Sequence, residues 1–74
     1  MNRTVLLIDD EQYIRETLGS ALKDEGYRVD TAAGGMSGIQ KTREQRFDVI
    51  MLDIWMPDMD GLEVLQRIRS EFPE

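Results

Sequence analysis

The chain has 74 residues, which is enough for one small domain with a single hydrophobic core. Its 15 acidic and 9 basic residues give a net charge of −6, and this balance argues against a surface that binds nucleic acid or an anionic membrane. The sequence contains no cysteine and no histidine, which excludes disulfides, thiolate metal sites and a histidine base, so any chemistry would have to use carboxylates.

The first half of the chain predicts a strand, a helix and a second strand. Thr4 to Ile8 is an apolar run without alternation, which is typical of a central parallel strand covered on both faces. Gln12 to Glu25 places apolar side chains at helical spacing, and Gly26 supplies a helix stop. Tyr27 to Thr31 alternates apolar and polar residues, which favours a half-exposed strand at the sheet edge.

The second helix, Met36 to Arg46, carries the weakest signal. Only Met36 and Ile39 mark an apolar face. Gly38 lies inside the helix and costs about 1 kcal/mol relative to alanine. We therefore expect this helix to be mobile.

A third strand and a third helix complete the pattern. Val49 to Leu52 is an apolar run long enough for a strand buried on both faces. A sharp turn follows, in which Gly61 permits a backbone conformation that a side chain would resist. The helix, Leu62 to Phe72, follows Asp60, a good N-cap with Glu63 at capping-box spacing.

This βαβαβα order predicts an α/β fold with a parallel sheet. With the strand order 2-1-3, right-handed crossovers place one helix on one face of the sheet and two helices on the other. No apolar stretch approaches membrane-spanning length, and the start of the chain is too short and wrongly flanked for a signal peptide. We therefore expect a cytoplasmic protein.

Carboxylates follow two strands that would be neighbours in this sheet. Asp9 and Asp10 follow the first strand, and Asp53 follows the third. Neighbouring strands lie about 4.8 Å apart, so the three side chains could share one cation. Without a cation they would repel one another, whereas a hard divalent ion such as Mg²⁺ relieves the repulsion and prefers oxygen ligands.

These acids also have ordinary structural interpretations. Asp9 and Asp10 could simply start the first helix, and Asp53 could close a strand before a turn. Two strands of one parallel sheet that end in acids at the same end are unlikely to arise by accident, so we favour the cation site. Asp58 and Asp60 are expected to serve only as turn and cap.

Three segments carry a family resemblance: LIDDE at residues 7–11, VIMLD at residues 49–53 and MPDMDG at residues 56–61. Together they resemble the receiver domain of two-component response regulators, and their spacing matches along the whole chain. The resemblance implies a flavodoxin-like fold and a phosphorylation-dependent signalling domain that catalyses only its own phosphoryl transfer.

Specific roles follow from the resemblance. It implies that Asp53 is the phosphoacceptor and takes its phosphoryl group from the phosphohistidine of a sensor histidine kinase. It implies Mg²⁺ as the cofactor, with Asp9, Asp10, Asp53 and the backbone carbonyl of Trp55 as ligands. An ionised Asp53 is already a nucleophile, so the chemistry needs position and charge neutralisation rather than a general base.

The family pattern has five βα units, and we expect residues 1–74 to be its N-terminal portion, with the fourth and fifth units absent. The third strand would then present an apolar outer edge, which invites pairing. If these residues were the whole polypeptide, we would expect self-association through this strand or partial unfolding. In a longer chain, the remaining part would cover the edge.

Two alternative functions stay open. The chain could be a half-receiver that acts only as a self-associating interaction module without phosphotransfer, and phosphate incorporation at Asp53 would separate the two. It could also be a magnesium phosphatase that uses Asp53. Enzymes of the haloacid-dehalogenase type usually place a second acid two residues later, where Trp55 stands, so this alternative ranks last.

Overall fold

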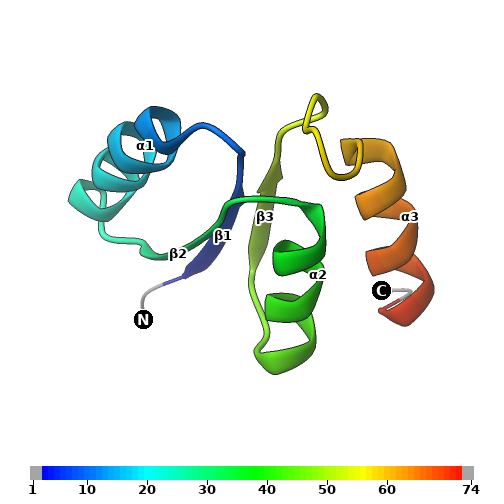
Figure 1. Ribbon diagram of the computed structural model, residues 1–74. Helices are drawn as coiled ribbons and strands as arrows, with labels where there is room; N and C mark the ends of the chain where they lie inside the picture. The colour runs from blue at the N-terminus through cyan, green and yellow to red at the C-terminus, as the bar shows by residue number, and fades with distance from the viewer. Residues whose placement is uncertain (1–2, 73–74) are drawn as a thin grey trace.

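The computed structural model describes residues 3–72, in which three strands alternate with three helices (Figure 1). The elements are β1 (Thr4–Ile8), α1 (Gln12–Asp24), β2 (Arg28–Ala32), α2 (Gly35–Glu44), β3 (Val49–Leu52) and α3 (Gly61–Glu71). The predicted βαβαβα order is confirmed, and the predicted boundaries differ by one or two residues at most. None of the helices in this part of the chain has the length and apolar content needed to span a membrane.

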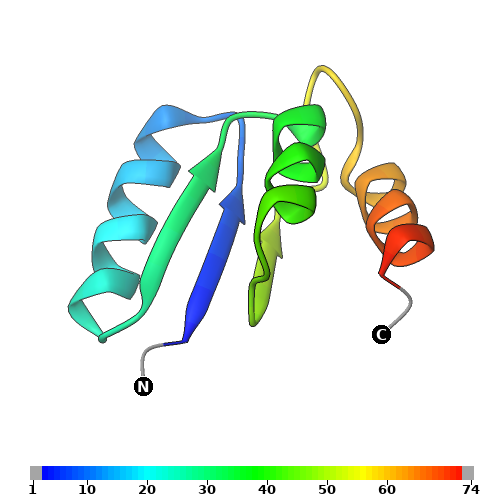
Figure 2. The same cartoon turned by 90° about the horizontal axis from the view of Figure 1, so that it is seen from below.

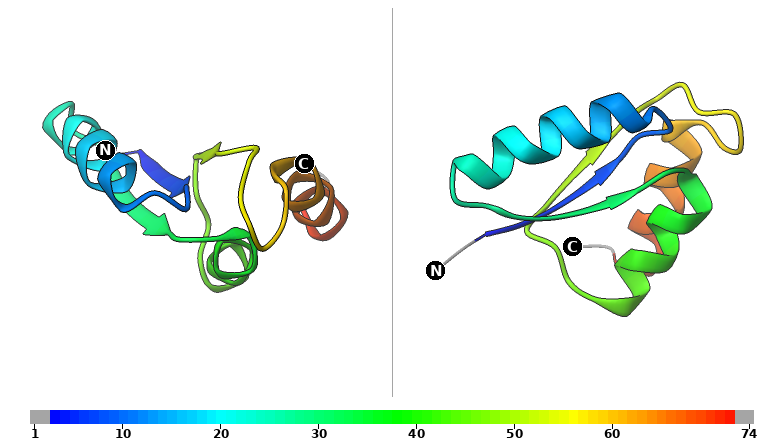
Figure 3. Two further views of the ribbon diagram at one scale, coloured as in Figure 1. Left: turned by 45° about the horizontal axis from the view of Figure 1, so that its top comes forward. Right: turned by 60° about the vertical axis from the view of Figure 1, so that its left-hand side comes forward.

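The three strands are parallel and lie in the order β2-β1-β3, as predicted (Figure 2). In this register Ile8 of β1 lies opposite Ala32 of β2 and Leu52 of β3, so all three strands end at the same edge of the sheet. Helix α1 covers one face, whereas α2 and α3 lie on the other (Figure 3). This distribution is the one that right-handed crossovers impose.

Strand β1 forms the centre of the molecule. Leu6 and Ile8 are fully buried and pack with Ile39 of α2 and with Val64 and Ile68 of α3. The side chains of β1 that point to the other face are also buried. The prediction that β1 is covered on both sides is therefore confirmed.

Strand β3 differs from the prediction that it is buried on both faces. Val49 is 42% exposed, and the other three residues of β3 are only half-buried. Within residues 3–72, β3 pairs with β1 alone, so its outer side has no neighbouring strand. An apolar run predicts a strand, but the number of neighbours on the sheet decides how deeply that strand is buried.

Helix α2 buries only one of the two residues that the sequence indicated for its apolar face, Ile39. Met36 is 49% exposed, so its assignment to the apolar face is wrong, whereas Gly38, Ile39 and Thr42 are buried. A Cβ atom on Gly38 would overlap the side chain of Ile8, so the glycine allows α2 to lie directly against β1. The cost of this glycine is thus offset by close packing, and the mobility of α2 stays a prediction.

Candidate functional site

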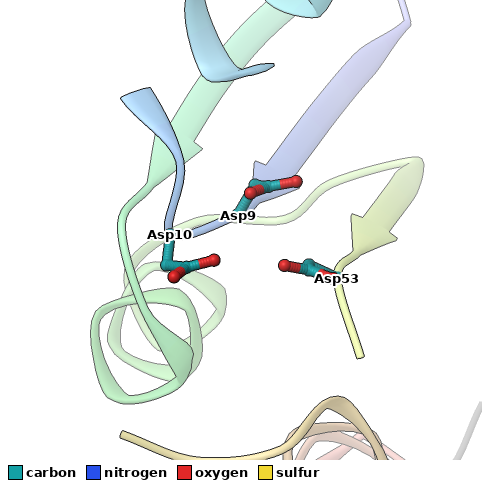
Figure 4. A group of neighbouring side chains, drawn as sticks. All are labelled: Asp9, Asp10 and Asp53. Carbon is teal, nitrogen blue, oxygen red and sulfur yellow. The ribbon is translucent and has the colours of Figure 1, made fainter. Parts of the chain in front are cut away.

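Three carboxylates meet at the edge of the sheet where β1 and β3 end. Asp9 and Asp10 follow β1, and Asp53 follows β3. One oxygen atom from each of these side chains lies within 4.8 Å of the others. Figure 4 shows the carboxylates of Asp10 and Asp53 directed toward one another, with Asp9 beside them. The structure thus brings together the three acids that the sequence analysis singled out, and their functional roles stay a prediction.

The sheet itself fixes two of these acids. The backbone N–H of Asp53 donates to the carbonyl of Ile8 at 2.9 Å, and the N–H of Asp9 donates to the carbonyl of Ala32 at 3.1 Å. Asp9 and Asp53 are half-buried, whereas Asp10 is exposed. The site is therefore anchored on its protein side and open toward solvent.

Several carboxylate oxygens of the site accept no hydrogen bond within residues 3–72. Asp9 Oδ1 accepts from the N–H of Glu11 at 2.9 Å, and Asp53 Oδ1 accepts from the N–H of Trp55 at 3.2 Å. Within residues 3–72, Oδ2 of each of these two carboxylates and the whole carboxylate of Asp10 have no hydrogen-bond donor. These oxygens are available to a ligand.

The interpretation of the acidic pair as an ordinary helix cap is not supported. The N-cap residue of α1 is Glu11, which lies beyond both aspartates, and no side chain caps this helix. Asp9 and Asp10 therefore lie before the helix, on the segment that leaves the sheet.

No basic side chain within residues 3–72 forms an ion pair with the acidic cluster. None of the three ion pairs formed within residues 3–72 includes Asp9, Asp10 or Asp53. The nearby guanidinium of Arg15 donates to the backbone carbonyl of Asp9 at 2.8 Å, not to a carboxylate. Three like charges at this range repel one another unless a cation lies between them. An all-oxygen set of this kind suits Mg²⁺, which binds through carboxylates and keeps several waters.

The loop after Asp53 turns sharply, for a reason that differs from the expected one. Gly61 does not adopt a left-handed conformation, since Gly26 is the glycine with a positive φ, of 96°. A Cβ atom on Gly61 would lie 2.5 Å from the carbonyl oxygen of Asp53. Its N–H also donates to the carbonyl of Ile54 at 2.8 Å. Gly61 is thus needed because α3 begins against the backbone of the site.

The two acids of this loop cap two different helices. Asp60 Oδ1 accepts from the N–H of Glu63 at 2.9 Å, which confirms the predicted cap of α3. The expectation that Asp58 forms only a turn is wrong, because its carboxylate accepts from the N–H groups of Gly35 and Met36, at the start of α2. These two bonds lower the pKa of Asp58 below its ordinary value. The donors lie more than 20 residues away, so no local pattern could reveal them.

Comparisons with known proteins agree with this geometry. The family model of the response regulator receiver domain matches residues 5–74. The probable transcriptional regulatory protein TcrX of Mycobacterium tuberculosis is 49% identical over 70 residues, which cover 95% of this chain and 30% of TcrX.

Solved structures show the same likeness. The response regulator TrrA of Thermotoga maritima, in complex with Mg²⁺ and BeF, has a TM-score of 0.92 and 41% identity, and the match covers 96% of this chain and 62% of that one. TrrA in complex with the histidine kinase ThkA gives a TM-score of 0.92 and 40% identity, covering 97% and 62% of the two chains. The chain therefore spans less than a third of the curated relative and about three fifths of the matched structures. Since the family model covers nearly all of its residues, this chain belongs to the response regulator receiver domain family.

Proposed function

We propose that Asp53 is a phosphoacceptor and that Mg²⁺ is held by Asp9, Asp10, Asp53 and the backbone carbonyl of Trp55. The observation that carries this proposal is the convergence of three aspartates within 4.8 Å, with no basic side chain paired to them in residues 3–72. The related TrrA structure is a complex with Mg²⁺ and BeF, which supports the choice of metal.

The chemistry requires little beyond the position of Asp53. One carboxylate oxygen of Asp53 attacks the phosphorus atom of the donor, a P–O bond forms, and the electron pair of the breaking bond leaves with the donor group. The bound cation would supply charge neutralisation for the phosphoryl oxygens. The sheet hydrogen bond between Asp53 and Ile8 holds the nucleophile in place, so the chain acts mainly by orientation.

The phosphoryl donor that we propose is the phosphohistidine of a sensor histidine kinase. Residues 1–74 contain no histidine, so a phosphohistidine must come from outside them. The related TrrA has been captured with the histidine kinase ThkA, which supports a partner of this kind. We expect the transfer to take place in the cytoplasm, as the sequence analysis predicts, and the domain to catalyse no reaction other than its own phosphorylation.

We also propose that residues 1–74 correspond to the first three βα units of a five-unit receiver domain. The match covers 96% of this chain but only 62% of the related TrrA chain, which supports this correspondence. The family match also favours a phosphoacceptor over a module that only self-associates.

Phosphate mapping tests the proposed function. The full encoded chain that carries these residues is incubated with Mg²⁺ and a small acyl phosphate, and the adduct is located by mass spectrometry. We expect one phosphate on Asp53, none in Asp53→Asn, and unchanged labelling in Asp60→Asn, which removes the same charge from the adjoining loop. Phosphate on Asp58 or Asp60, or full labelling of Asp53→Asn, would exclude the assignment, and turnover of a phosphomonoester would favour a phosphatase.

A further inference from the structure

The loop that follows Asp53 is held from several directions. At its end the N–H of Gly61 donates to the carbonyl of Ile54, which closes the loop on itself. In the middle Met56 is buried in the core, with 8% of its surface exposed. The side chain of Asp58 forms a third attachment, and it leads to a different helix, α2.

Helix α2 depends on this attachment because it has no side-chain cap of its own. Its N-cap residue is Gly34, which has no side chain, so the first N–H groups of the helix need an acceptor from elsewhere. Asp58 Oδ1 accepts from the N–H of Gly35 at 3.1 Å, and Oδ2 accepts from the N–H of Met36 at 3.2 Å. A carboxylate is also favoured at the positive end of the helix dipole.

The start of α2 packs closely against the loop that carries Asp58. A Cβ atom on Gly34 would lie 3.0 Å from Asp58 Oδ2. A Cβ atom on Gly35 would lie 2.8 Å from Val64 and 2.9 Å from Met59, the residue after Asp58. The two glycines thus form a backbone surface against which the loop lies, so a movement of the loop would break its contacts with the start of α2.

We propose that Asp58 is a positioning residue, which holds the loop carrying Trp55 in the conformation that the Mg²⁺ site uses and thereby couples α2 to that site. This inference rests on the proposed function, because the Trp55 carbonyl is one of the proposed ligands. Asp58 lies three residues after Trp55 and five after Asp53, so it acts through the backbone between them. Any cation that orders this loop also strengthens the cap of α2, and by linkage an intact cap tightens the binding of the cation.

A pair of matched substitutions separates this role from a simple effect of charge. In the full encoded chain, Asp58→Ala and Asp60→Ala each remove one negative charge and one helix cap from the same loop, but only Asp58 ties the loop to α2. Mg²⁺ affinity is measured by titration with the fluorescence of Trp55, the only tryptophan of residues 1–74. We expect Asp58→Ala to raise the dissociation constant about five- to tenfold, at the lower end of typical coupling between sites. Asp60→Ala should change it less than twofold.

Two further variants keep the test decisive if Asp58→Ala folds poorly. Asp58→Asn retains one acceptor oxygen and should give an intermediate affinity. Gly34→Ala leaves every charge in place but places a methyl group against the Asp58 carboxylate, so it should weaken Mg²⁺ binding in the same direction. The initial rate of phosphate incorporation in all of these variants should recover at saturating Mg²⁺, because the nucleophile itself is intact.

Equal losses of affinity in Asp58→Ala and Asp60→Ala would overturn the inference, since charge alone would then explain both. Lower thermal stability without any change in Mg²⁺ affinity would also overturn it and leave Asp58 as an ordinary cap. Failure of the proposed function looks different: the wild type would bind Mg²⁺ with the same dependence on Asp58 but take no phosphate on Asp53. A wild type that binds no Mg²⁺ would contradict both.

Discussion

Strands β1 and β3 look alike in the sequence and differ in the structure. Both are short apolar runs that end in aspartate, and they pair in register. Leu6 and Ile8 of β1 have no exposed surface, whereas Val49 of β3 is 42% exposed. The difference arises because β1 has a strand on each side, while β3, within residues 3–72, has one on its inner side alone. Apolar composition therefore predicts the strand and the position of the carboxylate that follows it, but it does not predict how deeply the strand is buried.

The largest expected effect compares two leucines, one on each strand. Leu6→Ala should lower the free energy of unfolding by about 2–5 kcal/mol, because it opens a cavity in a fully buried site. Leu52→Ala should cost about 1 kcal/mol, because Leu52 is only half-buried and solvent can fill the space. Chemical denaturation of both variants in a polypeptide of residues 1–74, at concentrations low enough to keep it monomeric, measures the difference, because a longer chain could cover β3. Equal losses of unfolding free energy in the two variants would show that β3 is as deeply buried as β1.

The second prediction concerns the outer edges of the sheet. The edge strand β2 carries Arg28 and Asp30, which discourage pairing, but β3 carries no charge. A polypeptide of residues 1–74 should therefore self-associate through β3 or be partly unfolded. Sedimentation should show a shift toward monomer in Val49→Lys, because a lysine on an edge strand opposes pairing. A compact, cooperatively folded wild-type monomer at micromolar concentration would contradict this prediction.

The smallest expected effect lies where the two strands begin. The carboxylate of Asp48 accepts from the N–H of Thr4 at 2.7 Å and from its hydroxyl at 3.1 Å, and these bonds hold the pKa of Asp48 below its ordinary value of 3.8. A lowered pKa contributes stability above pH 3.8 that is lost as the pH falls further, through the pKa of the folded state.

Asp48→Asn should therefore reduce the steepness of acid unfolding below pH 3.8, by a small amount because the side chain is exposed to solvent. Urea denaturation at several pH values, with Asp24→Asn as a control on the exposed end of α1, measures this effect. If the free energy of unfolding fell equally steeply below pH 3.8 in the wild type and in Asp48→Asn, the hydrogen bonds between Thr4 and Asp48 would not stabilise the fold.

Much of the site could be predicted because its signals are local. Apolar runs place Asp9 and Asp53 at strand ends, and the parallel order then brings them together without further information. The cap at Asp60 follows from its spacing to Glu63. Each of these inferences depends on residues that are close in sequence or on one general rule of sheet topology.

The remaining features depend on contacts between distant segments. Asp58 differs from Asp60 only because the start of α2 happens to lie beside it. Met36 is exposed because the face of α2 that meets the sheet is formed by Gly38, Ile39 and Thr42 instead. Gly61 is required by the approach of α3 to Asp53, which no turn preference reveals. Such features belong to packing, and a single sequence does not encode them in any local pattern.

A magnesium titration of the wild type and Asp10→Ala tests most directly whether the ends of β1 and β3 form one cation site. The wild type should give a saturable change in Trp55 fluorescence, and Mg²⁺ at ten times its dissociation constant should add about 1.4 kcal/mol to the free energy of unfolding. Asp10→Ala should lose most of both responses, because it removes one of three converging carboxylates. An unchanged titration in Asp10→Ala would show that the three aspartates do not act together.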